Sequence, residues 1–129
     1  MQGVEHVATA AAPAAIGPYS QAVRVGPWIW VSGQLGLDPA TGERVAGGVA
    51  AEAEQAMRNV LAILREAGLG AEHLVRVGIF VTDIASFAEV NAVYAAALGS
   101  ARPARATVEV SALPRGGRVE IEAVACAAL

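Results

Sequence analysis

Two segments with helical spacing lie among segments with strand spacing, and this arrangement limits the folds available to the chain. From Val49 to Ala67, and again from Phe87 to Leu98, apolar residues recur along one stripe. Ser86 and Glu89 form the capping-box pattern that predicts the start of the second helix. Elsewhere apolar and polar residues alternate with the period of two that a strand imposes. The chain is therefore expected to form a sheet with two helices, in the order β-β-β-α-β-α-β-β.

The predicted helices are amphipathic, so each has a side for the core and a side for solvent. The core stripe of the first helix comprises Ala53, Ala56, Met57, Val60, Leu61 and Leu64, and that of the second comprises Phe87, Val90, Tyr94 and Leu98. The charged residues of the first helix, beginning with Glu52, are expected to face solvent.

The sequence Leu74–Val81 is apolar on nearly both sides, with Val75, Val77, Ile79 and Val81 together on one face. This pattern predicts a central strand.

Two amphipathic helices can cover only one face of such a sheet. The residues assigned to the other face are Trp28, Trp30, Arg76, Arg105, Glu109, Glu120 and Glu122. Because this face is neither wholly polar nor wholly apolar, a second copy of the chain is expected to cover it. The pattern predicts a symmetric homo-oligomer with clefts between subunits.

Two strand-like segments, at 105–111 and 119–123, carry the charges with the clearest chemical potential, and they are expected to be adjacent strands. The guanidinium of Arg105 matches the planar shape of a carboxylate, and a glutamate such as Glu120 can orient or deprotonate water. The alternative is a structural ion pair between Arg105 and a glutamate on the next strand. Spacing alone favours the ion pair, because such pairs are frequent in sheets and catalytic pairs are rare.

Length and composition exclude several other classes of protein. The 129 residues fit a single domain, 1–129, and 55% of them are hydrophobic. A net charge of -3 argues against a nucleic-acid partner, since phosphate binding needs a basic surface. There is no run of about 18 apolar residues to span a membrane, and the N-terminal segment does not resemble a signal peptide. These features and a single cysteine, Cys126, predict a cytoplasmic protein.

Metal and nucleotide chemistry have little support in the sequence. The two histidines, His6 and His73, are far apart and show no ligand spacing, so no metal site is predicted. No glycine-rich phosphate loop or nucleophile elbow is present.

Four ordered segments resemble the reactive intermediate deaminase A (RidA) family, also called the YjgF family. They are IGPYSQAV around Tyr19, SGQLGLDPATGE around Ser32 and Gly33, FAEVNAVY around Asn91, and the pair formed by Pro103–Val108 and Val119–Glu122. The resemblance covers nearly all of the chain. It implies an α+β fold like that of the trimeric bacterial chorismate mutase: a mixed six-stranded sheet with two helices on one face, assembled as a homotrimer with sites at subunit interfaces.

The resemblance also implies an activity, which is the hydrolysis of enamine and imine intermediates such as 2-aminoacrylate and 2-iminopropionate to 2-keto acids and ammonia. No cofactor is required. Arg105 would bind the substrate carboxylate with help from the backbone of Gly33, and Glu120 would hold the attacking water. Tyr19, Ser32 and Asn91 would line the pocket. Thr107 stands where many deaminating members carry a cysteine, so its hydroxyl rather than a thiol would contact the substrate.

Two alternatives remain at this point. The trimer could bind small keto or imino acids as a sensor or carrier without turnover. A ribonuclease activity, sometimes attributed to relatives, is the weakest alternative, because the chain is acidic and has no basic groove.

Overall fold

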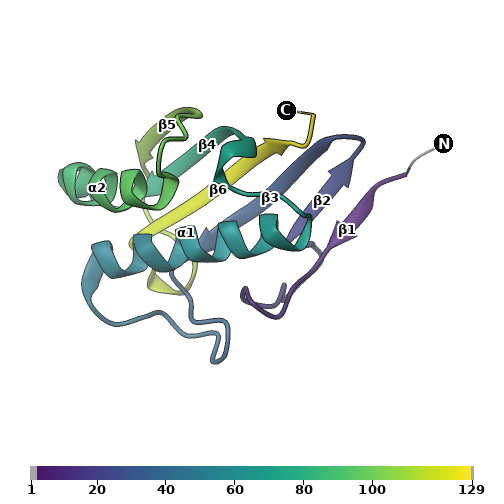
Figure 1. Cartoon of the computed structure of the whole chain (residues 1–129). Coiled ribbons are helices and arrows are strands. Elements are labelled where there is room, and N and C mark those ends of the chain that lie inside the picture. The colour runs from purple at the N-terminus through teal and green to yellow at the C-terminus, as the bar shows by residue number, and fades with distance from the viewer. Residues whose placement is uncertain (1–2, 129) are drawn as a thin grey trace.

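All six strands join one sheet in the order β1-β2-β3-β6-β4-β5 in the computed structural model, which describes residues 3–128 (Figure 1). The elements are β1 (Glu5–Val7), β2 (Ala22–Val25), β3 (Trp28–Leu35), α1 (Gly48–Glu66), β4 (Leu74–Val81), α2 (Phe87–Leu98), β5 (Ala104–Glu109) and β6 (Val119–Cys126), with short 3-10 helices η1 (Ala71–His73), η2 (Ile84–Ser86) and η3 (Pro114–Gly116). β4 and β5 are parallel and the other neighbours are antiparallel. The predicted fold and element order are confirmed.

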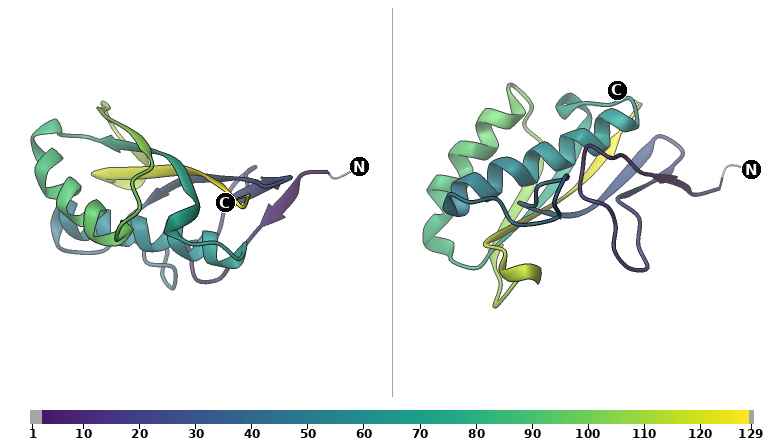
Figure 2. Two further views of the ribbon diagram at one scale, coloured as in Figure 1. Left: turned by 45° about the horizontal axis from the view of Figure 1, so that its top comes forward. Right: turned by 90° about the horizontal axis from the view of Figure 1, so that it is seen from below.

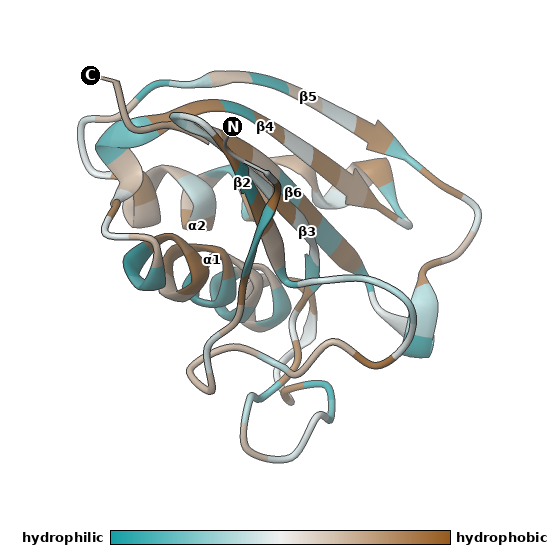
Figure 3. Cartoon of the chain, turned by 90° about the vertical axis from the view of Figure 1, so that its right-hand side faces the viewer, coloured by the Kyte–Doolittle hydropathy of each residue, from teal (hydrophilic) through white to brown (hydrophobic). Residues whose placement is uncertain are grey.

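The two helices lie on the same face of the sheet, as the edge-on view in Figure 2 shows, and the core fills the space between them and the strands. Along the strands hydrophobic and hydrophilic residues alternate (Figure 3). On β3, Ile29 and Val31 are buried under the helices, whereas Trp28 and Trp30 are 42% and 53% exposed on the opposite, open face. The alternation therefore predicted the two faces of β3 correctly.

β5 and β6 are not neighbours, so the prediction that they are adjacent strands is wrong. The chain leaves β4, passes through α2 and returns as β5 parallel to β4, which is a βαβ unit. β6 then enters between β3 and β4 and pairs antiparallel with both. β4 thus separates Arg105 from Glu120, and the cross-strand ion pair between them does not form within one subunit.

Arg105 and Glu109 were also assigned to the wrong face. Both residues are aligned with buried residues of β4, Arg105 with Val77 and Glu109 with Val81, and therefore lie on the side of the helices. Glu109 Oε1 accepts a hydrogen bond of 2.9 Å from the backbone N–H of Ile84 in η2. Because β5 is an edge strand with little burial on either side, alternation alone could not decide its orientation.

Four local predictions are corrected by the structure. Glu52 does not face solvent, since it is 0% exposed, and Phe87 is 41% exposed rather than part of the core. Val75 is exposed because the register of β4 against β6 shifts between Leu74 and Arg76. The capping box is absent: Ser86 Oγ instead donates a 2.6 Å hydrogen bond to the carbonyl of Asp83.

Residues 3–128 contain no helix with both the length and the apolar character that crossing a membrane requires.

Candidate active site

Arg105 projects from β5 toward α2, where three side chains fix its guanidinium. Its Nη1 donates a 2.6 Å hydrogen bond to Oδ1 of Asn91. Its Cζ lies 5.5 Å from the ring centroid of Phe87 and 5.1 Å from that of Tyr94, within the range of a cation–π contact. An arginine has five N–H donors. Arg105 is exposed, so the donors that do not face Asn91 can meet a ligand carboxylate.

The groove beside Arg105 has a volume of about 530 Å³, and it is lined by Asn91, Tyr94, Ala95, Leu98, Arg102, Pro103 and Arg105. Burial raises the pKa of Tyr94, and the positive charges of Arg105 and Arg102 oppose this effect. The phenol is therefore protonated at neutral pH. Among the described residues, neither the Tyr94 hydroxyl nor the half-buried Thr107 hydroxyl has a hydrogen-bond partner.

Glu120 lies on the open face of the sheet, opposite the face that carries Arg105. It is aligned with Phe80 on β4 and with Leu35 on β3. Burial raises the pKa of Glu120, and the nearby negative charge of Glu122 raises it further. A carboxylate with a raised pKa is a stronger base, which suits proton transfer from water.

Gly33 gives Glu120 the room for its position. A Cβ atom added to Gly33 would lie 2.9 Å from both Cδ and Oε2 of Glu120, closer than real Cβ contacts allow. The register of β3 against β6 shifts between Val31 and Gln34, so Gly33 belongs to a bulge. The glutamate side chain therefore lies directly against the backbone of β3 at this bulge.

Ser32 precedes Gly33 on β3, and one hydrogen bond connects it to the segment that contains Tyr19. Ser32 Oγ donates a 2.6 Å hydrogen bond to the carbonyl of Ser20, the residue after Tyr19. This bond ties the exposed Tyr19 to the bulge of β3.

The seven predicted site residues thus form two groups. Arg105, Asn91 and Thr107 belong to the helix-side group, which we call the arginine group. Glu120 with Gly33, and Ser32 with Tyr19, form the second, which we call the glutamate group. The two groups do not meet within one subunit, because the sheet lies between Arg105 and Glu120.

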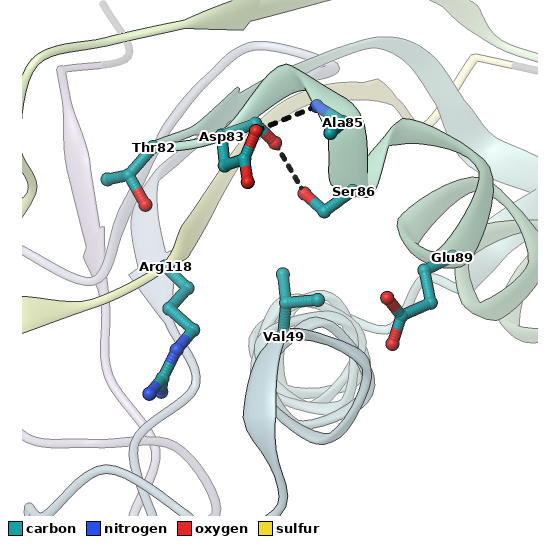
Figure 4. Close-up of a pocket in the computed structure, with 7 residues that line it drawn as sticks. All are labelled: Val49, Thr82, Asp83, Ala85, Ser86, Glu89 and Arg118. Atoms are coloured by element: carbon teal, nitrogen blue, oxygen red, sulfur yellow. Dashed lines mark hydrogen bonds between the residues drawn. The ribbon is translucent and has the colours of Figure 1, made fainter.

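A separate pocket of about 450 Å³ lies between the N-terminal end of α1, η2 and the start of β6 (Figure 4). Its lining is Val49, Thr82, Asp83, Ala85, Ser86, Glu89 and Arg118, none of which is a predicted site residue.

Sequence reasoning missed the aromatic partners of Arg105 and the role of Glu122. Phe87, Asn91 and Tyr94 are spaced i, i+4 and i+7, which places them on one side of α2. That spacing was a usable signal, although Phe87 and Tyr94 were assigned to the core alone. The influence of Glu122 on Glu120 depends on their separation in space, which alternation does not provide.

The chain is similar to known proteins over most of its length. Residues 9–127 match the endoribonuclease L-PSP family. The chain is 55% identical over 119 residues to the bovine (Bos taurus) 2-iminobutanoate/2-iminopropanoate deaminase, covering 92% of this chain and 87% of that protein.

Two solved structures from E. coli have the same fold. The YjgF gene product is 46% identical with a TM-score of 0.90, covering 95% of this chain and 98% of that one. TdcF with bound serine is 38% identical with a TM-score of 0.90 and the same coverage of 95% and 98%. The chain therefore belongs to the endoribonuclease L-PSP family, the YjgF/RidA family that the four sequence segments resemble.

Proposed function

We propose that this protein hydrolyses the imines of small 2-keto acids, of the 2-iminopropanoate and 2-iminobutanoate type, to 2-keto acids and ammonia. The observation that carries the proposal is the pairing of two features: an exposed guanidinium fixed by Asn91 and two aromatic rings, and a half-buried glutamate with a raised pKa. The guanidinium can bind a carboxylate, and the glutamate can accept a proton from water. The name of the bovine relative supports the same reaction.

Arg105 binds the substrate carboxylate in this proposal. A guanidinium can donate two parallel N–H bonds to a carboxylate, which fixes both the position and the plane of the substrate. Asn91 occupies Nη1 and so sets the direction in which the remaining donors point. The Gly33 backbone assists at the carboxylate, and Tyr19, Ser32 and Thr107 line the pocket.

Glu120 activates the water. The carboxylate accepts a proton from water as the oxygen bonds to the imine carbon, and the C=N double bond becomes a C–N single bond. That proton then passes from Glu120 to the nitrogen, which gives a carbinolamine with one hydroxyl and one amino group. The hydroxyl next loses its proton, which Glu120 transfers to the nitrogen, so that the C–O bond becomes a C=O bond as the C–N bond breaks. Ammonia leaves, and the 2-keto acid is the second product. An enamine such as 2-aminoacrylate enters the same path once its terminal carbon is protonated. Water, a guanidinium and a carboxylate suffice, so the proposal includes no cofactor.

The proposed assembly is a homotrimer with three sites at subunit interfaces. The sheet separates Arg105 from Glu120 within a subunit, so a site that uses both needs the arginine group of one copy and the glutamate group of the next. The exposed Trp28 and Trp30 on the open face supply apolar area for such an interface. We place the enzyme in the cytoplasm, and the net charge of -3 gives it no attraction for nucleic acid.

The alternative function is ligand binding without turnover. It is favoured by one observation, the serine bound to TdcF, since that relative holds a small amino acid. In this case calorimetry would detect binding of a 2-keto acid to the protein, and no ammonia would be released from an imine.

A coupled assay tests the proposal. A pyridoxal-phosphate enzyme generates 2-aminoacrylate, and semicarbazide traps the imine that has not yet been hydrolysed. The protein is expected to compete with the trap and lower the yield of semicarbazone, whereas Arg105→Ala is expected to leave that yield unchanged. An unchanged yield with the wild-type protein would refute the deaminase activity.

A further inference from the structure

Helix α1 contains two fully buried polar residues, Glu52 and Asn59, that the proposed reaction does not use. Both are 0% exposed. A buried charge or amide is costly unless its polar atoms have partners. We propose that these two residues, which we call the α1 clamp, position Glu120 from the opposite side of the sheet. The inference rests on the proposed function, in which Glu120 activates water.

Glu52 holds the start of β6. Its Oε1 accepts a 2.9 Å hydrogen bond from the backbone N–H of Arg118, and its Oε2 accepts a second bond from the Arg118 guanidinium. Arg118 is two residues before Glu120. In Figure 4 the Arg118 side chain extends away from Asp83 and Glu89, the two carboxylates of that pocket. Its charge is therefore directed to Glu52.

The same carboxylate also reaches the turn that precedes β6. Nη1 of Arg44 lies 3.5 Å from Glu52 Oε2 and donates a 2.6 Å hydrogen bond to the carbonyl of Gly116 in η3. Glu52 thus connects both the turn and the first residues of the strand to α1.

Asn59 holds the end of β3 in the same way. Its Nδ2 donates to the carbonyls of Leu35 at 3.2 Å and Leu37 at 3.0 Å, and its Oδ1 accepts a 2.8 Å bond from Gln55. Leu35 is the residue aligned with Glu120 across the β3–β6 ladder. Asn59 therefore fixes the strand segment that lies beside the catalytic glutamate.

Helix α1 also lies directly against the residue that follows β3. A Cβ added to Gly36 would lie 2.5 Å from the Cα and carbonyl oxygen of Glu52, so the two backbones touch there. Glu120 lies near the start of β6 and beside the end of β3. Both of these strand ends are hydrogen-bonded to α1. A displacement of about 1 Å in a reacting group can cost about 100-fold in rate.

Replacement of Glu52 tests the clamp. Glu52→Leu fills a similar volume but accepts no hydrogen bond, and we expect kcat to fall by about 10-fold to 100-fold. We expect KM to change by about twofold or less, because the carboxylate-binding Arg105 is held by Asn91 of α2 and has no hydrogen bond to Glu52 or Arg118. Glu52→Gln keeps an acceptor for the Arg118 N–H and should retain kcat within about threefold. Asn59→Leu should behave as Glu52→Leu.

Glu54→Gln is the matched control, because Glu54 lies on the same helix, is exposed and pairs only at the surface with Arg58 at 2.6 Å. It should leave kcat and KM unchanged. A second control separates positioning from general damage: in a Glu120→Gln background, Glu52→Leu should cause no further loss, since it acts through Glu120. An unchanged kcat in Glu52→Leu, equal losses in the Leu and Gln variants, or additive losses with Glu120→Gln would overturn the inference.

A measurement without turnover distinguishes failure of the clamp from failure of the proposed function. The carboxyl ¹³C signal of Glu120 in the NMR spectrum reports the surroundings of that side chain. It should move in Glu52→Leu and stay in place in Glu54→Gln, whether or not the protein hydrolyses imines. An unmoved signal in Glu52→Leu would overturn the clamp alone, while an inactive wild-type protein would overturn the proposed reaction alone.

Discussion

The separation of Arg105 and Glu120 by the sheet leads to a test with two inactive variants. In the proposed homotrimer, Arg105→Ala removes the guanidinium assigned to the substrate carboxylate and Glu120→Gln removes the proposed base, so each variant alone is expected to lose nearly all of its activity. In a mixed trimer, however, an interface can join the intact glutamate group of one variant to the intact arginine group of the other. Mixing the two variants should therefore restore activity.

The size of the recovery follows from the geometry of the interfaces. In a ring of identical subunits each interface joins one arginine group to one glutamate group. With equal amounts of both variants and random assembly, an interface is intact when Arg105 comes from the Glu120→Gln chain and Glu120 comes from the Arg105→Ala chain. Each condition holds in about one half of cases, so about one quarter of the interfaces should be intact. The mixture should show about one quarter of the wild-type activity per site.

Co-expression of the two variants would give this random mixture, and the semicarbazide assay would measure its activity. Purification on two affinity tags would keep only the mixed trimers, each with one intact interface in three, so their activity should be about one third of the wild-type value per site. The control is co-expression of two differently tagged Arg105→Ala chains, in which no interface can be intact. Activity of the mixture no greater than that of this control would refute the shared site. So would full activity of either variant alone.

Three further predictions follow from single residues. Burial and Glu122 both raise the pKa of Glu120. As the pH falls, activity that needs deprotonated Glu120 should therefore be lost at a higher pH than with an ordinary glutamate. Glu122→Gln should lower this pKa and move the acidic limb of the kcat/KM profile to lower pH, and an unmoved limb would contradict the role of Glu120. Gly33→Ala places a Cβ 2.9 Å from the flexible end of Glu120, so it should reduce kcat with little change in unfolding free energy, as steady-state kinetics and urea denaturation would show; equal losses of both would contradict the assignment. Ile63→Ala empties a fully buried site and should cost about 2–5 kcal/mol in unfolding free energy, measured by urea denaturation at fixed protein concentration; a loss well below this range would mean that the core collapses around the gap.

The periodicity of hydrophobic residues predicted the secondary structure well, because the residues on the buried side of a helix or strand recur at regular spacing along the sequence. The first helix was expected over Val49–Ala67 and forms over Gly48–Glu66. The buried and exposed sides of β3 were also correct. Period contains no information on which strands pair, however, and residues close in sequence were taken as neighbours. The βαβ unit of β4, α2 and β5 was the signal that could have corrected this, since parallel strands need such a crossover.

The candidate site was predicted from family resemblance rather than from spacing. Spacing favoured an ion pair between Arg105 and a glutamate, and the structure shows that Arg105 contacts α2 instead. Glu52 was missed for a related reason: a charge on a helix is usually solvated. Its burial here depends on Arg118, which is 66 residues away in the sequence, and on Arg44 in the loop before α1.

The central position of β6 has a consequence for the order of folding during synthesis. β6 is the last of the six strands to leave the ribosome. It lies between β3 and β4 and pairs with both, so it alone joins the two halves of the sheet. Before residues 119–126 emerge, the strands of the nascent chain can pair only as two separate sheets, the β1-β2-β3 meander and the parallel β4-β5 pair. Their inner edges, on β3 and β4, are then open to pairing with other chains. The nascent chain is thus most exposed to aggregation just before β6 closes the sheet.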